Sequence, residues 1–268
     1  MSQFQPVIKW SGSKRSQATT IASHTPLFNR YYEPFVGGGS IAYAISPDKG
    51  VCGDICKPLI NLWRSIQSDY ESLYEQYKIR WERLQNEGYL VYYEIRDNFN
   101  KNHDSNDLFF LSRTCVNGLI RFNKNGDFNN SLHHTRKGIE PERLKSVLSD
   151  WSERLQGIEF FSGDYWETTQ DVKSGDFVYL DPPYFNTKGR YFGTIDFERF
   201  IDYLDSLNSK GVKYALSFDG MRGDTDYSVE LPTKLYKQHL MVPSGNSSFK
   251  KVMDKKCEAV YESLYLNY

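Results

Sequence analysis

The tetrapeptide Asp181-Pro182-Pro183-Tyr184 joins a carboxylate to a stiff, extended backbone and an aromatic ring. The apolar, β-prone run from Gly175 to Leu180 precedes it and predicts a buried strand. The two prolines end that strand because they supply no backbone N–H. Ligands of open α/β sheets bind at the carboxyl ends of strands, where this carboxylate and the free carbonyls can accept hydrogen bonds from an exocyclic amine. The alternative is a rigid strand exit whose Asp merely caps a turn.

Glycines follow the first predicted strand of the chain. Gly37, Gly39 and Ala42 fit the spacing G-x-G-x-x-G/A, which lets the backbone turn sharply and lie against a ligand. The next predicted strand, Gly50 to Gly53, ends in Asp54, and an acid at this place accepts hydrogen bonds from ribose hydroxyls. Together the two features predict a pocket for a nucleoside-containing cofactor, and no residue here demands a pyrophosphate.

Two further segments can contribute to such a pocket. A strand predicted from Ile158 to Phe161 leads to Asp164 and Tyr165. The Asp164 carboxylate can accept from an adenine amino group while the Tyr165 ring packs on the base, but a helix N-cap explains the same aspartate equally well. Residues 7–15 carry three positive charges, no acid and Trp10. They can hold an anionic or polar ligand, or they form a solvated basic terminus.

A basic segment lies between the strand predicted at residues 50–53 and the strand predicted at residues 158–161. Residues 111–145 contain seven Lys or Arg side chains and only three acids, interleaved with Asn, His and aromatic residues. Asn125-Gly126, between Arg121-Phe122 and Phe128-Asn129, predicts a β-hairpin. Such a hairpin suits insertion into a DNA groove, where Arg reads guanine edges and Asn reads adenine edges. A solvated basic hairpin is the alternative.

The elements that position these motifs predict an α/β fold interrupted by a helical insertion. Apolar residues recur at helical spacing within 73–84 and 144–155. Residues 57–157 are therefore expected to form an inserted, mainly helical domain that bears the hairpin. The alternation of strands and helices in residues 1–56 resumes in residues 158–268, and the two parts are expected to form one open sheet.

Composition narrows the class of protein without identifying it. The length of 268 residues allows one or two domains, and the net charge of −1 means that any nucleic-acid surface is local. The four cysteines lack metal-binding spacing, and His133 and His134 lack acid or Cys partners, so no metal site is expected. No stretch is apolar enough for a signal peptide or a membrane span, which predicts a cytoplasmic protein with reduced thiols and no membrane partner.

The order of these motifs resembles that of the Dam-type DNA adenine-N6 methyltransferases (the D12, or alpha-group, class). In that family a glycine motif precedes Asp-Pro-Pro-Tyr, and the recognition domain lies between them. The resemblance spans nearly the whole chain. The matching segments are Lys9-Trp10 with Lys14, Glu33 to Ser40, Asp54-Ile55, Asn117-Gly118-Leu119 with Arg121, Gly126 to Asn129, the Asp181 tetrapeptide and Asn267-Tyr268.

The resemblance implies a Rossmann-like methyltransferase sheet that binds S-adenosylmethionine, with double-stranded DNA as substrate and an inserted target-recognition domain. The cofactor pocket would be lined by Trp10, Lys14, Phe35, Gly37, Gly39, Ser40, Asp54, Asp164, Tyr165 and Asp181. The catalytic residues would be Asp181, Pro182, Pro183 and Tyr184. DNA would be contacted by Lys9, Asn117, Leu119, Arg121, Asn123, Lys124, Asn129, His133, Arg136 and Lys137, with Arg121 as the base-reading candidate. The expected role is restriction-modification, with a cognate restriction endonuclease as partner, or Dam-like marking of DNA, and the enzyme would act in the cytoplasm at the nucleoid of a bacterial or phage host.

The chemistry of the tetrapeptide agrees with this expectation. An adenine amine is a poor nucleophile because its lone pair is delocalised into the ring. Asp181 and the Pro182 carbonyl can each accept one N6–H and so localise that lone pair, and the transfer then depends mainly on positioning. Tyr184 can stack on the base once it has left the helix.

Two departures from the family pattern leave the recognition sequence open. Val116 stands where relatives that methylate GATC usually carry an aromatic residue, and Ser131-Leu132-His133 replaces a Pro-Phe-Gly.

Three other functions also stay open from the sequence. Cytosine-N4 methylation uses the same geometry, although that group more often has Ser in place of Asp181. The others are a nicotinamide-dependent oxidoreductase built on the glycine loop and a catalytically silent nucleic-acid-binding module.

Overall fold

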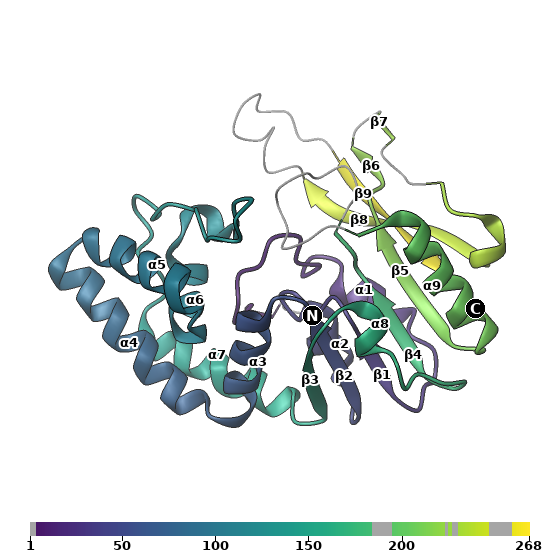
Figure 1. Ribbon diagram of the computed structural model, residues 1–268, viewed down its shortest axis with the longest axis horizontal. Coiled ribbons are helices and arrows are strands. Elements are labelled where there is room, and N and C mark those ends of the chain that lie inside the picture. The colour runs from purple at the N-terminus through teal and green to yellow at the C-terminus, as the bar shows by residue number, and fades with distance from the viewer. Residues whose placement is uncertain (1–3, 184–194, 223–224, 227–229, 247–258) are drawn as a thin grey trace.

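The computed structural model describes residues 4–183, 195–222, 225–226, 230–246 and 259–268. Its centre is one mixed sheet with the strand order β3-β2-β1-β4-β5-β9 (Figure 1). The parallel strands are β1 (Tyr31–Glu33), β2 (Gly50–Asp54), β3 (Ile158–Ser162), β4 (Phe177–Leu180) and β5 (Lys213–Phe218). β9 (Ala259–Leu266) is antiparallel to β5 and to β8 (Gln238–Asn246). The short strand β6 (Met221–Arg222) pairs with β9, and β7 (Thr225–Asp226) pairs with β6. The predicted α/β sheet is confirmed.

Helices cover both faces of the sheet, and this explains why the central strand β4 is continuously apolar. All four residues of β4 are buried, with Phe177 and Tyr179 in one core and Val178 and Leu180 in the other. The first core also contains side chains of α1 (Ala18–Ser23), α2 (Ser40–Ile45) and α3 (Lys57–Ser68). The second contains side chains of α8 (Tyr165–Thr168), α9 (Phe197–Ser209) and the 3₁₀ turn η2 (Thr233–Leu235).

A helical lobe extends from one side of the sheet (Figure 1). It comprises α4 (Tyr70–Glu87), α5 (Leu90–Asn102), α6 (Ser105–Thr114), the 3₁₀ turn η1 (Val116–Gly118) and α7 (Pro141–Arg154). Local sequence explains the helix starts: Asp69 and Asp104 cap α4 and α6 with their side chains, and α7 begins with Pro141. The two stretches with helical apolar spacing are α4 and α7, as predicted.

The lobe and the sheet share one continuous apolar core. Trp63 of α3 and Trp151 of α7 stack with ring centroids 5.3 Å apart, and Trp63 also stacks on Phe160 of β3 at 5.9 Å. The segment 57–157 is therefore joined to the sheet through packed side chains, and we retain its boundaries as a proposal. In the part of the chain that the structure describes, no helix is both long enough and apolar enough to cross a membrane.

Candidate active site and nucleic-acid interface

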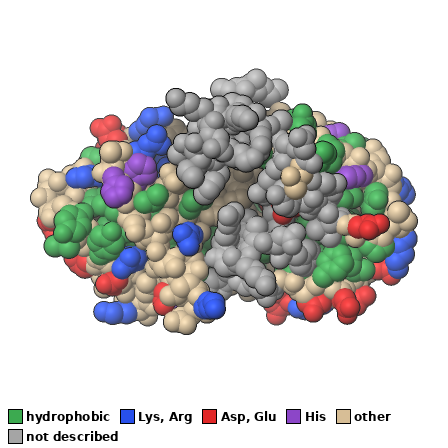
Figure 2. All heavy atoms as spheres, turned by 90° about the horizontal axis from the view of Figure 1, so that it is seen from above, with side chains coloured by type: hydrophobic (Ala, Val, Ile, Leu, Met, Phe, Trp, Pro, Cys, Tyr) green, Lys and Arg blue, Asp and Glu red, His purple; other side chains and the backbone are tan. Residues whose placement is uncertain are grey.

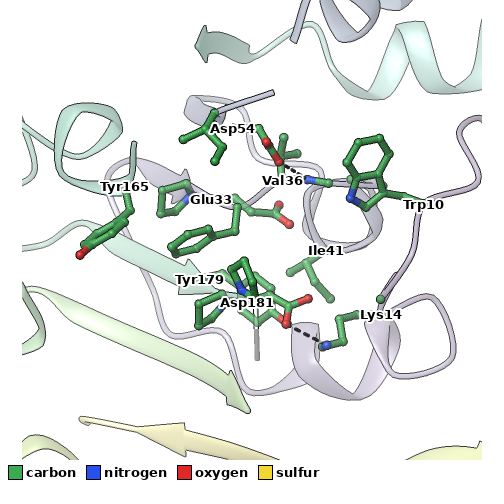
Figure 3. A pocket seen from close by; sticks show the side chains of 18 of the residues that line it. Trp10, Lys14, Glu33, Val36, Ile41, Asp54, Tyr165, Tyr179 and Asp181 are labelled. Carbon is green, nitrogen blue, oxygen red and sulfur yellow. Dashed lines mark hydrogen bonds and ion pairs between the residues drawn. The ribbon is translucent and has the colours of Figure 1, made fainter. Parts of the chain in front are cut away.

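The carboxyl ends of β3, β2, β1 and β4 meet at one edge of the sheet because these strands are parallel neighbours. A pocket of about 1090 Å³, partly open to solvent, lies at this edge (Figure 3). Its walls include every residue predicted to bind the cofactor: Trp10, Lys14, Phe35, Gly37, Gly39, Ser40, Asp54, Asp164, Tyr165 and Asp181. Pro182 and Pro183 also line it, whereas Tyr184 lies outside the described residues.

The glycine loop between β1 and α2 follows a backbone path that other residues rarely adopt. Gly37 has a φ of +44° and Gly39 a φ of +66°. A Cβ atom on Gly37 would lie 2.8 Å from Cδ1 of Trp10, and one on Gly39 would lie 2.9 Å from the Trp63 ring. Backbone conformation and tryptophan packing therefore both require glycine at these two positions.

Gly39→Ala is expected to lower the free energy of unfolding by about 2 kcal/mol, because the left-handed conformation costs roughly 1–2 kcal/mol and the Trp63 ring must also move. Urea unfolding measures the change. Gly211→Ala is the matched control: Gly211 has a φ of +68°, but a Cβ there would lie 3.4 Å from Oγ of Ser174, an ordinary van der Waals contact. Equal losses in the two variants would contradict a contribution from Trp63.

Glu33 is a pocket residue that the sequence prediction did not single out. Its side chain is only 2% exposed, and its Oε2 accepts hydrogen bonds from the Tyr31 hydroxyl at 2.8 Å and from the Ala42 amide at 2.9 Å. Burial raises the pKa of Glu33 to about 8. The sequence held a signal for it, since Glu33 ends β1 as Asp54 ends β2.

Asp54 connects the end of β2 to the glycine loop. Its Oδ1 accepts a hydrogen bond from the Cys56 amide at 2.9 Å, and its Oδ2 accepts one from the Gly37 amide at 3.3 Å. Burial raises the pKa of Asp54 to about 6. An ionised carboxylate has about four acceptor positions, so two remain for a ligand in the pocket.

Asp164 is the N-cap of α8, so the N-cap interpretation of this residue is right. Its Oδ1 accepts a hydrogen bond from the Glu167 amide at 2.9 Å, and the Glu167 side chain accepts one in return from the Asp164 amide at 2.8 Å. The other oxygen of Asp164 pairs with Arg199 at 2.7 Å. Asp164 nevertheless lines the pocket, where the rings of Phe35 and Tyr165 lie 5.5 Å apart.

Asp181 follows β4 and forms an ion pair with Lys14, at 2.8 Å from Nζ to Oδ1 (Figure 3). The Lys14 side chain is 5% exposed and that of Asp181 18% exposed. Burial raises the pKa of Asp181 to about 6, and the Lys14 ammonium opposes that rise. Lys14 also pairs at 3.1 Å with Glu262, a residue of β9 that the sequence did not single out.

Three of the predicted DNA-binding residues lie beside this pocket. Lys9, Asn117 and Leu119 line a second, more open groove that shares Trp10 with the first. Asn117 is exposed, with a φ of +57°, and the Leu119 side chain is 45% exposed. The loop thus presents one polar and one apolar side chain to solvent.

Side chains from two other segments fix the backbone of the loop formed by residues 116–120. Asn130 donates from Nδ2 to the carbonyls of Val116 at 3.1 Å and Leu119 at 2.8 Å. Ser11 donates to the Ile120 carbonyl at 3.0 Å. The sequence did not predict either residue, because both act on backbone atoms of distant segments.

The predicted hairpin is present as an antiparallel pairing on either side of Asn125-Gly126. Phe122 and Phe128 form an antiparallel bridge, and the Gly126 amide donates to the Asn123 carbonyl at 3.0 Å. Gly126 has a φ of +85°, so the loop has three residues and ends in a left-handed glycine. Asn123 is used within the turn, because its Oδ1 accepts from the amides of residues 125 and 127.

The other predicted DNA-binding side chains divide into exposed residues and residues with internal contacts. Arg121, Lys124, Asn129, Arg136 and Lys137 are exposed. His133 is half-buried, and its Nδ1 accepts from the amides of residues 135 and 136. Arg113 contributes to the basic count in the sequence but is only 6% exposed and donates to the carbonyls of residues 6 and 7. Figure 2 shows Lys, Arg and His side chains on the face of the helical lobe seen from above.

Cysteine and histidine add no metal centre to the described part of the chain. Within the described ranges, no group of three or more His, Cys, Asp or Glu side chains is arranged to hold a metal ion. Cys52, Cys56 and Cys115 are buried free thiols, and Cys257 lies outside the described residues.

Comparison with known proteins adds an independent observation. The model of the D12 class N6 adenine-specific DNA methyltransferases matches residues 10–249. The type II methyltransferase M.MjaIII of Methanocaldococcus jannaschii is 29% identical over 307 residues, covering 99% of this chain and 100% of that protein. The type II methyltransferase M1.LlaDCHI of Lactococcus lactis subsp. cremoris is 30% identical over 238 residues, covering 80% of this chain and 81% of that protein. The DNA adenine methylase of Vibrio cholerae is 31% identical over 188 residues, covering 69% of this chain and 66% of that protein.

Proposed function

This chain belongs to the D12 class N6 adenine-specific DNA methyltransferases, and we propose that it transfers a methyl group from S-adenosylmethionine to N6 of an adenine flipped out of double-stranded DNA. The observation that carries this proposal is the position of Asp181. Its carboxylate lies in the same pocket as the glycine loop and Asp54. One pocket thus contains acceptors for an exocyclic amine and acceptors for a nucleoside.

The residues of the pocket fit S-adenosylmethionine. Gly37 and Gly39 let the backbone approach a ligand closely, and Asp54 has acceptor positions free for ribose hydroxyls. The rings of Trp10, Phe35 and Tyr165 offer apolar walls for an adenine. When bound, S-adenosylmethionine would supply its sulfonium methyl group to N6 and leave as S-adenosylhomocysteine, and the Asp181 carboxylate that accepts an N6–H would be placed to take up the proton that the amine loses.

Asp181 and the Pro182 carbonyl have the task of preparing the amine. Each accepts one N6–H, which localises the nitrogen lone pair that the adenine ring otherwise delocalises. Lys14 pairs with Oδ1 of Asp181, and we propose that Oδ2 accepts the N–H. The stiff Pro182-Pro183 backbone keeps both acceptors in place, so positioning supplies most of the rate enhancement.

The direct test is to incubate the protein with plasmid DNA and isotopically labelled S-adenosylmethionine, digest the DNA to nucleosides and identify the labelled nucleoside by mass spectrometry. We expect N6-methyladenine. Labelled N4-methylcytosine, or no labelled nucleoside with protein that binds S-adenosylhomocysteine, would overturn the proposal. Modification-sensitive sequencing of the same plasmid identifies the recognition sequence.

Family membership decides between the enzymatic alternatives that the sequence left open. The matched family is adenine-specific, so cytosine-N4 methylation is not the activity of this class. The mechanism of a nicotinamide-dependent oxidoreductase would give no function to the ion pair of Asp181 and Lys14. Binding of S-adenosylhomocysteine without binding of NAD tests the second point.

We propose that the exposed residues of the hairpin read the DNA. Arg121→Ala is expected to reduce discrimination at one base pair by about 1–3 kcal/mol, because an arginine forms two hydrogen bonds to a guanine edge. Methylation rates on a set of oligonucleotides with single base-pair changes measure this loss.

Lys124→Ala is the matched control for Arg121, since both side chains are exposed on the same hairpin. A lysine that contacts phosphate contributes to affinity for every sequence, so this variant should weaken all oligonucleotides equally. An unchanged order of preference in Arg121→Ala would remove Arg121 from base reading.

We further propose that the enzyme acts on cytoplasmic DNA alongside a cognate restriction endonuclease. Two of its relatives are named type II methyltransferases, which supports such a pairing. Plasmid methylated by this protein would then resist one endonuclease of the same specificity. Cleavage by every endonuclease that recognises the methylated sequence would contradict the pairing.

A further inference from the structure

Lys14 lies between two carboxylates that come from the end of β4 and from β9, two strands separated in the sheet by β5. Its Nζ is 2.8 Å from Oδ1 of Asp181, after β4, and 3.1 Å from Oε2 of Glu262, on β9. Lys14 is 5% exposed, and each of the two carboxylate side chains is 18% exposed. Because water has little access, the Lys14 ammonium interacts strongly with both carboxylates.

The orientation of Glu262 is set by a hydroxyl on the neighbouring strand. Ser244 of β8 donates to Oε1 of Glu262 at 3.0 Å, which leaves Oε2 on the side of Lys14. The backbone of β9 is itself held between β5 and β8. Glu262 is therefore fixed at both its backbone and its side chain, and it can hold the Lys14 ammonium in one place.

Among the described residues, acidic groups outnumber basic groups around Asp181. Besides Lys14 and Glu262, the described titratable groups that act on Asp181 include Glu33 on β1, Asp219 after β5 and Tyr179 on β4. A lysine paired with Asp181 alone would lower the pKa of Asp181 further and make its carboxylate a weaker hydrogen-bond acceptor. A lysine shared with Glu262 keeps the carboxylate ionised but leaves it a stronger acceptor.

We propose that Glu262 is a positioning residue for methyl transfer: by sharing Lys14 with Asp181, it holds the ammonium on Oδ1 and leaves Oδ2 a strong acceptor for the N–H of the target amine. The proposal rests on the proposed function of Asp181. It assigns a role to β9, a strand that contributes no residue to the motifs of the sequence.

Lys14 and Glu262 have opposite effects on the pKa of Asp181, and this gives the test its sign. Burial raises the pKa of Asp181, the Lys14 charge lowers it and the Glu262 charge raises it. Methyl transfer needs the ionised form, so activity falls as the pH drops through this pKa, which is about 6. Removing the charge of Glu262 must move the acid limb to lower pH, and removing that of Lys14 must move it to higher pH.

The experiment compares the pH dependence of kcat/KM for the wild type, Glu262→Gln and Lys14→Gln. We expect the acid limb to shift down by about 0.5–1 pH unit in Glu262→Gln and up by a similar amount in Lys14→Gln. In Glu262→Gln, kcat should also fall by about 10-fold, because Asp181 becomes a weaker acceptor. Asp205→Asn is the control, since Asp205 forms an exposed ion pair with Lys234 at 3.2 Å and does not line the pocket.

If Glu262 has a purely structural role, Glu262→Gln will lower the Tm without moving the acid limb, and that result would overturn the proposal. Shifts of the acid limb in the same direction in Glu262→Gln and Lys14→Gln would also overturn it. A second measurement does not depend on activity. Carbon-13 NMR of labelled aspartate carboxyl groups, assigned with Asp181→Asn, follows the titration of Asp181 directly. Opposite shifts there, in a protein that transfers no methyl group, would refute the proposed function and retain the charge sharing; parallel shifts would refute the charge sharing.

Discussion

Asp181→Ala is expected to lower kcat for methyl transfer by about 10³-fold or more, because the variant loses the acceptor that localises the amine lone pair in a site with little water. Binding of S-adenosylhomocysteine and of DNA should change only a few-fold. The fold should persist, since Lys14 keeps Glu262 as a partner when Asp181 is removed. Single-turnover transfer of a labelled methyl group measures the loss.

Asp181→Asn provides the graded comparison. It keeps one acceptor oxygen of similar shape but no charge, so we expect a loss of about 10²-fold, smaller than that of the alanine variant. Asp205→Asn controls for the loss of a surface carboxylate. Turnover of Asp181→Ala within about 10-fold of the wild type, with the protein folded, would contradict a catalytic role for Asp181.

Asp54→Ala is expected to weaken binding of S-adenosylhomocysteine by about 2–3 kcal/mol, or roughly 30–150-fold, because hydrogen bonds from ribose hydroxyls to a charged carboxylate are lost. Part of the loss comes from the glycine loop, since the Gly37 amide also loses its acceptor. Isothermal titration calorimetry measures the affinity. Asp54→Asn, which keeps an acceptor for the loop, separates the two contributions.

The affinity of the wild type should also depend on pH with a definite sign. Burial raises the pKa of Asp54 to about 6, and the ionised form binds the hydroxyls better. Affinity should therefore be full well above pH 6 and weaken as the pH falls through that value, and Asp54→Asn should lose this dependence. Glu159→Gln, on the exposed side of β3, is the control because its carboxylate pairs only with Arg30 among the described ion pairs.

Much of the active site was accessible from sequence because local rules decide its parts. Strands that are apolar on both faces, glycines at positions of positive φ and acids directly after strands are all properties of short segments. Because parallel neighbours end at the same edge, these segments predict that Asp54, Asp164 and Asp181 meet. The same rule, applied to Glu33 at the end of β1, would have added it to the site.

Local patterns in the sequence therefore predicted the sheet, the glycine loop and the strand exit at Asp181-Pro182-Pro183, whereas packing between distant segments sets the partners of each side chain. Glu262 reaches Lys14 because β9 runs antiparallel beside β5, a pairing between distant segments that no local pattern encodes. Arg113 belongs to a basic segment but is buried, because α6 packs it against the N-terminal residues. Local sequence patterns decide where strands and helices begin and end. The pairing and packing of segments far apart in the sequence decide which charged groups face one another.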